Sequence, residues 1–148
     1  MKRITLALLV VVAALLGVPA ALAGHPHFVT LGAFVDSQGR LVCKFRLAGL
    51  GSTTGQDTTV TCSATSTVSY GGGSGPCPPG FSSGSNSYLG YGSGTISGSV
   101  SLTAPGIGCG VGIYSVSYYD VAITDSTIGS KSAYPIPGTF TRTIAAAV

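Results

Sequence analysis

The chain has 148 residues, and only 7% of them are charged: seven Lys or Arg against four Asp, with no Glu. The formal net charge of +3 includes Lys2 and Arg3, so the rest of the chain carries a net charge of +1. So few charges create no basic field, which excludes nucleic acid and an anionic membrane surface as expected partners.

The first residues have the form of an export signal. Two cations precede an apolar run over residues 4–18, and the Ala21-Leu22-Ala23 triplet provides a small-x-small cleavage site before Gly24. The alternative is a membrane anchor, but the run is shorter than the ~20 residues that a span needs. We therefore expect cleavage of residues 1–23, export of a single domain over residues 24–148, and no transmembrane span after cleavage.

Two strands and a turn are expected at the start of this domain. Residues 28–35 form the first strand, and its core face carries Val29, Leu31, Ala33 and Val35. Residues 36–40 (Asp-Ser-Gln-Gly-Arg) form the turn. The second strand covers residues 41–47, where the alternation directs Cys43 to the core.

The longest strand pattern lies between Asp57 and Tyr70. From Thr58 onward, every odd position carries a hydroxyl group, and most even positions are apolar. Successive side chains of a strand point to opposite faces, so one face of this strand is expected on the core and the other in water. A hydroxylated face also indicates an antiparallel sheet that is covered on one side only.

The four cysteines are expected to form two disulfides, because thiols oxidise outside the cytoplasm. Three pairings are possible, and zinc is disfavoured because no Cys-x-x-Cys spacing occurs. A hairpin across residues 48–56 would place Cys43 beside Cys62 on the same inward face, which favours that pair. Cys77 and Cys109 would then join two Gly-rich loops at one end of the sheets.

Residues 71–94 predict the longest irregular segment, with nine glycines and three prolines. A loop of that length is uncommon in a compact domain unless it is functional or mobile. Rigid aromatic side chains among small polar residues are typical of recognition surfaces. The candidate partner-binding residues are therefore Phe81, Tyr88 and Tyr91; the alternative is that these rings cover the ends of the sheets and fill the core.

The remaining residues predict three further strand regions and no helix. Residues 95–103 repeat the half-buried pattern, and residues 113–124 change phase, which a bulge near Tyr118 and Tyr119 would reconcile. Residues 131–144 contain Pro135 and Pro137, so they should lie at an edge or a bend. The expected fold is an all-β, antiparallel β-sandwich of about seven strands with immunoglobulin-like architecture.

Three segments carry a family resemblance: Phe-Arg-Leu-Ala-Gly-Leu-Gly at residues 45–51, the alternating strand 59–70, and residues 118–141 with Val-Ala-Ile-Thr-Asp and Ile-Pro-Gly-Thr-Phe. Together they resemble small secreted proteins of unassigned function that are common in actinobacteria. The resemblance implies export and a small β-sandwich, with Cys77 and Cys109 in the places of that family's two cysteines. It implies no substrate.

Few residues could carry chemistry. His25 and His27 are the only imidazoles, and a free amine at Gly24 beside them could bind Cu(II), although Pro26 removes one backbone nitrogen ligand. No Gly-x-Ser-x-Gly motif occurs, so a secreted hydrolase is a weaker alternative. We expect a secreted, non-catalytic protein without a cofactor that binds an extracellular protein or an envelope glycan, or that is a subunit of an extracellular assembly.

Overall fold

The computed structural model describes residues 26–50, 56–71, 77–90, 94–126 and 133–145, with only the backbone at residues 56, 57, 89 and 90. These residues form eight strands in two antiparallel sheets. No helix occurs in the described ranges, so none of them contains a helix that could cross a membrane.

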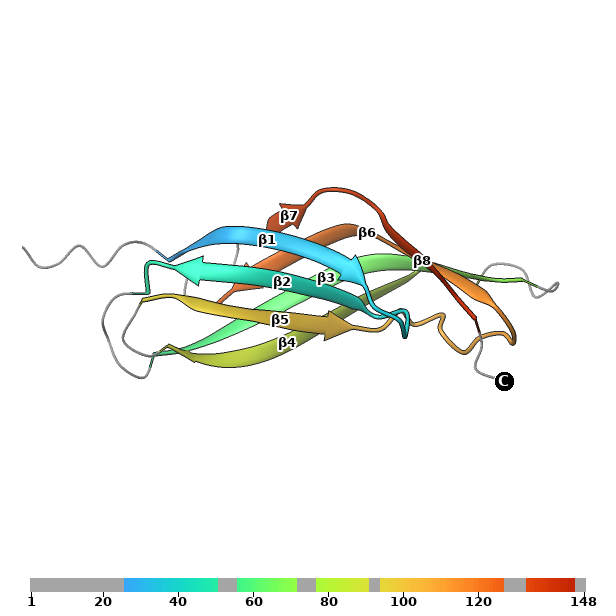
Figure 1. Cartoon of the computed structure of the whole chain (residues 1–148), viewed down its shortest axis with the longest axis horizontal. Coiled ribbons are helices and arrows are strands. Elements are labelled where there is room, and N and C mark those ends of the chain that lie inside the picture. Colours follow the sequence, from blue (N-terminus) through green and yellow to red (C-terminus); the bar gives the residue numbers. More distant parts are fainter. Residues whose placement is uncertain (1–25, 51–55, 72–76, 91–93, 127–132, 146–148) are drawn as a thin grey trace, which may run out of the picture.

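The smaller sheet has three strands in the order β1-β2-β5. Its strands are β1 (His27–Val35), β2 (Leu41–Ala48) and β5 (Ile96–Leu102). They lie side by side in the front layer of Figure 1. Alternating apolar residues form these strands because each strand buries one face only.

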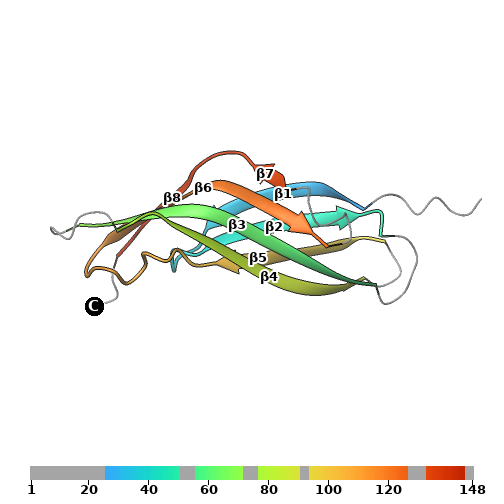
Figure 2. The same ribbon diagram turned by 180° about the vertical axis from the view of Figure 1, so that it is seen from behind.

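The larger sheet has five strands, and β6 lies at its centre. Its strands are β3 (Gln56–Tyr70), β4 (Gly80–Gly90), β6 (Tyr114–Asp125), β7 (Tyr134–Ile136) and β8 (Phe140–Ile144). The order is β4-β3-β6-β7, and β8 pairs with the first half of β6. Figure 2 views the molecule from the side of β3, β4 and β6.

The hydrophobic core lies between the two sheets and confirms the β-sandwich expectation. The fully buried side chains come from both sheets: Leu41, Cys43, Leu47 and Val100 from the smaller one, and Val60, Cys62, Val68, Val116, Tyr118, Val121 and Ile123 from the larger one. The described residues form eight strands where about seven were expected: β4 was not predicted, and the strand region expected over residues 131–144 is divided into β7 and β8. The immunoglobulin-like architecture of the sandwich stays a prediction.

The Cys43–Cys62 disulfide is confirmed, but the hairpin that was used to predict it is wrong. β2 pairs with β1 and β5, whereas β3 pairs with β4 and β6, so the two cysteines lie in different sheets. Their Cα atoms are 6.4 Å apart across the core, and both side chains are fully buried. The alternation identified the inward face correctly, since both cysteines do point inward. The bond therefore joins the two layers of the sandwich.

The prediction of an irregular segment over residues 71–94 is wrong for its second half. Residues 80–90 form β4, which pairs with β3 from Ser66↔Gly80 to Gln56↔Gly90. The sequence of β4 is rich in Gly and Ser, which have a low intrinsic preference for strands. Pairing with residues 56–66 of β3 stabilises the strand instead. The predicted Cys77–Cys109 disulfide is confirmed, and it lies just before β4.

Two bulges decide which residues of β1 and β6 face the core. The β1–β2 register shifts between Phe28 and Thr30, so Phe28 packs against the core and Val29 is 50% exposed, contrary to the prediction for Val29. The predicted change of phase in β6 is confirmed, and the extra residue lies just after Tyr119. A bulge inserts one residue into one strand of a pair, which exchanges the faces on either side of it.

Side chains close both open sides of the sandwich. On one side, Tyr88 Oη and Asn86 Nδ2 of β4 both donate to the carbonyl of Ser99 in β5, at 2.6 and 3.0 Å. On the other side, Arg142 of β8 donates to the carbonyl of Val35 in β1 at 3.1 Å. These contacts occupy carbonyl groups that an edge strand would otherwise offer to another chain.

Candidate binding face

The outer face of the five-stranded sheet carries an array of hydroxyl groups. Register pairing places the odd residues of β3 on this face together with their partners in the neighbouring strands. We call the following set the hydroxyl face: Thr59, Thr61, Ser63, Thr65, Thr67 and Ser69; Phe81, Ser83, Ser85 and Ser87; Ser115, Ser117, Tyr119, Ala122 and Thr124; Pro135, Thr141 and Thr143.

The hydroxyl groups interact in rows that run across the strands. Thr61 Oγ1 lies 2.8 Å from Ser85 Oγ on β4, and Thr124 follows on the other side of Thr61 in β6. A second pair, Ser117 Oγ and Thr141 Oγ1, is also 2.8 Å apart. Cross-strand hydroxyl pairs of this kind orient donors and acceptors while leaving other lone pairs directed to solvent.

Two aromatic rings lie in one row of this face. Phe81 of β4 and Tyr119 of β6 both pair with Thr65 of β3, one on each side. Neighbouring strands are about 4.8 Å apart, so the two Cα atoms are separated by about 10 Å. Phe81 is 67% exposed, although a Phe side chain is usually buried. The row therefore carries an exposed ring, Phe81, and a half-buried ring, Tyr119, with a hydroxyl group between them.

The two outer faces of the sandwich differ in charge. The smaller sheet presents Lys44 and Arg46 outward, and Lys44 Nζ lies 4.9 Å from the centre of the Phe34 ring. The described side chains of the hydroxyl face carry no charge; register also places Asp57 at one end of this face, opposite Leu89, and Asp120 lies next to Tyr119 in the β6 bulge. The face is thus suited to an uncharged ligand.

The three predicted partner-binding residues are not gathered at one place. Phe81 lies on the hydroxyl face, whereas Tyr88 points to the opposite side of β4 and packs edge-on against Phe45, with ring centres 5.1 Å apart. Tyr91 lies outside the described residues. The sequence reasoning missed Tyr119, which it used only to locate a change of strand phase. The sequence does not show that Tyr119 pairs with Thr65, and this pairing is what places Tyr119 on the hydroxyl face.

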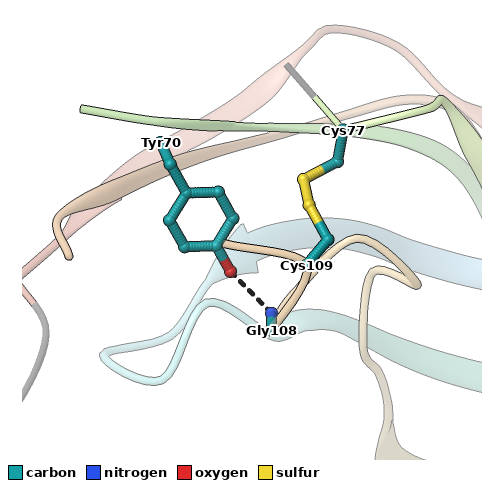
Figure 3. The surroundings of a disulfide bond; sticks show 4 residues. All are labelled: Tyr70, Cys77, Gly108 and Cys109. Atoms are coloured by element: carbon teal, nitrogen blue, oxygen red, sulfur yellow. Dashed lines mark hydrogen bonds between the residues drawn. A yellow bond between two sulfur atoms is a disulfide. The ribbon is translucent and has the colours of Figure 1, made fainter. Parts of the chain in front are cut away.

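A cluster of tyrosines holds the turns at one end of the molecule. The backbone N–H of Gly108 donates to Tyr70 Oη at 2.6 Å, and the Cys77–Cys109 bond lies beside this contact (Figure 3). Tyr118 Oη accepts from the N–H of Ala104 at 2.9 Å. These hydroxyl groups fix the turn between β5 and β6, so their role here is structural.

The described aspartates do not form a catalytic pair or a metal site. Asp36 is bound by the turn that it starts, with Arg40 Nε at 2.8 Å from its Oδ2. Partial burial opposes ionisation of Asp36, but hydrogen bonds from Arg40 and Gln38 outweigh it and lower its pKa. Asp125 is buried and accepts from Thr58 Oγ1.

Metal binding at the N-terminus stays a prediction. His27 is described and exposed, whereas Gly24 and His25 lie outside the described residues. Within the described ranges, no three His, Cys, Asp or Glu side chains come together as a metal site would require. The hydrolase alternative also stays a prediction.

Comparison with known proteins gave no match among family models, curated protein sequences or solved structures. The resemblance to small secreted actinobacterial proteins therefore stays a prediction.

Proposed function

We propose that this protein is an exported, non-catalytic binding protein whose hydroxyl face holds a neutral polysaccharide of the cell envelope or its surroundings. The observation that carries the proposal is the row formed by Phe81, Thr65 and Tyr119. A hydroxyl pair, Ser117 and Thr141, lies in the next row on one side, and another, Thr61 and Ser85, lies two rows away on the other side. No cofactor and no catalytic residue enter the proposal.

Export is supported by two independent features of the chain. Residues 1–23 have the composition of a signal peptide, with a small-x-small site at Ala21 to Ala23. Both disulfides, Cys43–Cys62 and Cys77–Cys109, are of the kind that persists in oxidising compartments. An exported protein of this type meets polysaccharides outside the cell.

The chemistry of the hydroxyl face supports a neutral polysaccharide as the partner. A sugar ring has an apolar face of C–H groups, which can pack on an aromatic ring, and a rim of hydroxyl groups that need hydrogen-bond partners. Phe81 and Tyr119 supply the rings, and the neighbouring Ser and Thr side chains supply donors and acceptors. A polysaccharide chain lying across the strands would meet both rings.

A protein partner, the other expected class, is less well supported by this face. Protein interfaces usually have an apolar centre that buries several large side chains. Phe81 is the single large aliphatic or aromatic side chain strongly exposed on the described part of the face, where small hydroxyl residues predominate. A subunit of an extracellular assembly would need an apolar interface centre on another surface of the molecule.

Co-sedimentation with insoluble polysaccharides tests the proposal. The full-length chain is expressed with its export signal, and the secreted protein is mixed with cellulose, chitin, starch granules or purified peptidoglycan. We expect retention on at least one of them and about fivefold weaker retention of Phe81→Ser, since losing one aromatic contact costs about 1 kcal/mol.

Phe34→Ser is the matched control, because Phe34 is a 43% exposed ring on the opposite face. The control should be retained like the wild type. The proposal fails if the wild type is retained on none of the four materials, or if Phe81→Ser and Phe34→Ser are retained equally.

A further inference from the structure

The bulge in β6 gives the hydroxyl face one feature that a regular strand would lack. Thr65 pairs with Tyr119, but Ser63 pairs with Ala122, so one residue more lies on β6 than on β3. Val121 is buried on the core side, which leaves two consecutive residues, Tyr119 and Asp120, on the outer side. Bulges often re-aim a side chain in this way beside functional sites.

Asp120 has a backbone conformation that its side chain makes costly. Its φ angle is +52°, and it is the one residue other than glycine with a positive φ in the described ranges. Asp tolerates this region better than most residues, but glycine adopts it without penalty. The chain therefore holds an exposed carboxylate at a position where glycine would fold more easily.

A shallow hollow lies beside Asp120. It is lined by Asp120 and Ala122 of β6 and by Pro135, Pro137 and Gly138 around β7. Ala122 and Pro135 are paired residues of the hydroxyl face, so the hollow continues that face beyond Tyr119. Small and rigid side chains line it, which leaves room for a ligand group next to the carboxylate.

We propose that Asp120 is the specificity-determining residue of the hydroxyl face. In this proposal a sugar ring packs on Tyr119, and the Asp120 carboxylate accepts hydrogen bonds from two neighbouring hydroxyl groups of that ring. Two oxygens of one carboxylate suit a vicinal diol, and hydrogen bonds to a charged acceptor are among the strongest in proteins. The ligand class is thus a neutral polysaccharide with free vicinal hydroxyl groups.

This inference rests on the proposed function and adds direction to it. The polysaccharide would run from Phe81 over Thr65 to Tyr119, perpendicular to the strands, and end its contact at Asp120. Because no residue of the row formed by Phe81, Thr65 and Tyr119 is charged, this carboxylate would dominate the choice among polysaccharides of similar shape. Polymers with blocked hydroxyl groups or with negative charge would be rejected.

Two variants separate recognition from a structural role of the bulge. Asp120→Asn keeps the shape and the tolerance of positive φ but removes the charge, whereas Asp120→Gly removes the side chain and relieves the backbone. Retention of both variants is measured on cellulose and starch granules, whose glucose units carry free vicinal hydroxyl groups, together with the urea midpoint of unfolding. Retention of the wild type only on chitin or peptidoglycan, whose sugar units lack such a diol, would overturn the inference. We expect about tenfold weaker retention of Asp120→Asn and retention of Asp120→Gly at least as weak.

The unfolding midpoint should be unchanged in Asp120→Asn and unchanged or higher in Asp120→Gly. The wild type should also lose retention on the O-methylated form of the polysaccharide that retains it. The role of Asp120 would be overturned if both variants were retained as strongly as the wild type. It would also be overturned if both variants lost retention together with a lower urea midpoint of unfolding. If Phe81→Ser still loses retention in that case, the proposed function stands without this inference.

Discussion

Single tyrosine hydroxyl groups hold two turns at one end of the molecule, the turn between β1 and β2 and the turn between β5 and β6. Tyr118 is fully buried, accepts from the N–H of Ala104, and donates to the carbonyl of Gly39 at 2.7 Å. Tyr114 Oη donates to the carbonyl of Gln38 at 3.0 Å in a more exposed position. The same kind of bond should therefore differ in energetic value between the two tyrosines.

Tyr118→Phe should lower the free energy of unfolding by about 1–3 kcal/mol, because it leaves a buried N–H and a buried C=O without their partner. Tyr114→Phe is the matched control and should cost less than about 1 kcal/mol, since water can replace its hydroxyl group. Urea unfolding of the oxidised proteins measures both. Equal losses of unfolding free energy in the two variants would show that the buried hydrogen bonds of Tyr118 stabilise the fold no more than the exposed bond of Tyr114 does.

The burial of Tyr118 also predicts a dependence on alkaline pH. Burial raises the pKa of Tyr118, although the N–H of Ala104 partly favours the phenolate. In the unfolded chain the phenol ionises near pH 10, so this contribution is complete below about pH 10 and is lost as the pH rises through the higher folded pKa. Between about pH 8 and about pH 11, the wild type should lose more stability than Tyr118→Phe. Parallel losses in the two proteins would contradict this assignment.

At the scale of the elements, the sequence was most informative where the alternation within one strand shows which of its side chains face the core. The period of two in β3 gave its inner and outer residues correctly, and the change of phase in β6 indicated the bulge after Tyr119. β4 could not be predicted because its Gly and Ser residues carry no strand preference, and β3 supplies its pairing. The Cys43–Cys62 pair was predicted from a pairing of β2 with β3 that does not occur, because an alternating pattern shows which side chains point inward but not which sheet a strand joins.

The two disulfides should differ in what they stabilise. Each closes a loop in the unfolded chain and should contribute about 2–4 kcal/mol in the chain-entropy model. Cys43–Cys62 joins the two sheets, whereas Cys77–Cys109 joins the start of β4 to the turn before β6. Cys43→Ala, Cys62→Ala should thus speed hydrogen exchange in strands of both sheets. Cys77→Ala, Cys109→Ala should speed it mainly at residues 77–80 and 104–112.

Hydrogen exchange with mass spectrometry distinguishes these patterns, and each double variant serves as the control for the other. A Cys77→Ala, Cys109→Ala variant with faster exchange throughout β1 and β2 would contradict the local role of that bond. Unchanged exchange in the Cys43→Ala, Cys62→Ala variant would contradict the role of its bond between the sheets.

At the scale of the whole molecule, the sandwich separates two chemically different faces. One carries Lys44 and Arg46, and the other is the uncharged hydroxyl face with Phe81 and Tyr119 in one row. The sequence predicted the hydroxyl groups of β3 but not their neighbours, because a face is assembled from strands that are distant in the chain. Of the two predicted binding residues that the structure describes, Phe81 lies on this face, whereas Tyr88 closes one side of the sandwich.

An NMR titration with soluble oligosaccharides cut from the polysaccharide that retains the protein tests the central claim most directly. We predict amide shifts confined to the hydroxyl face, strongest around Phe81, Thr65 and Tyr119, while β1, β2 and β5 stay unchanged. Shifts that cluster around Lys44 and Arg46 on the opposite face, or that spread evenly over both sheets, would contradict the account.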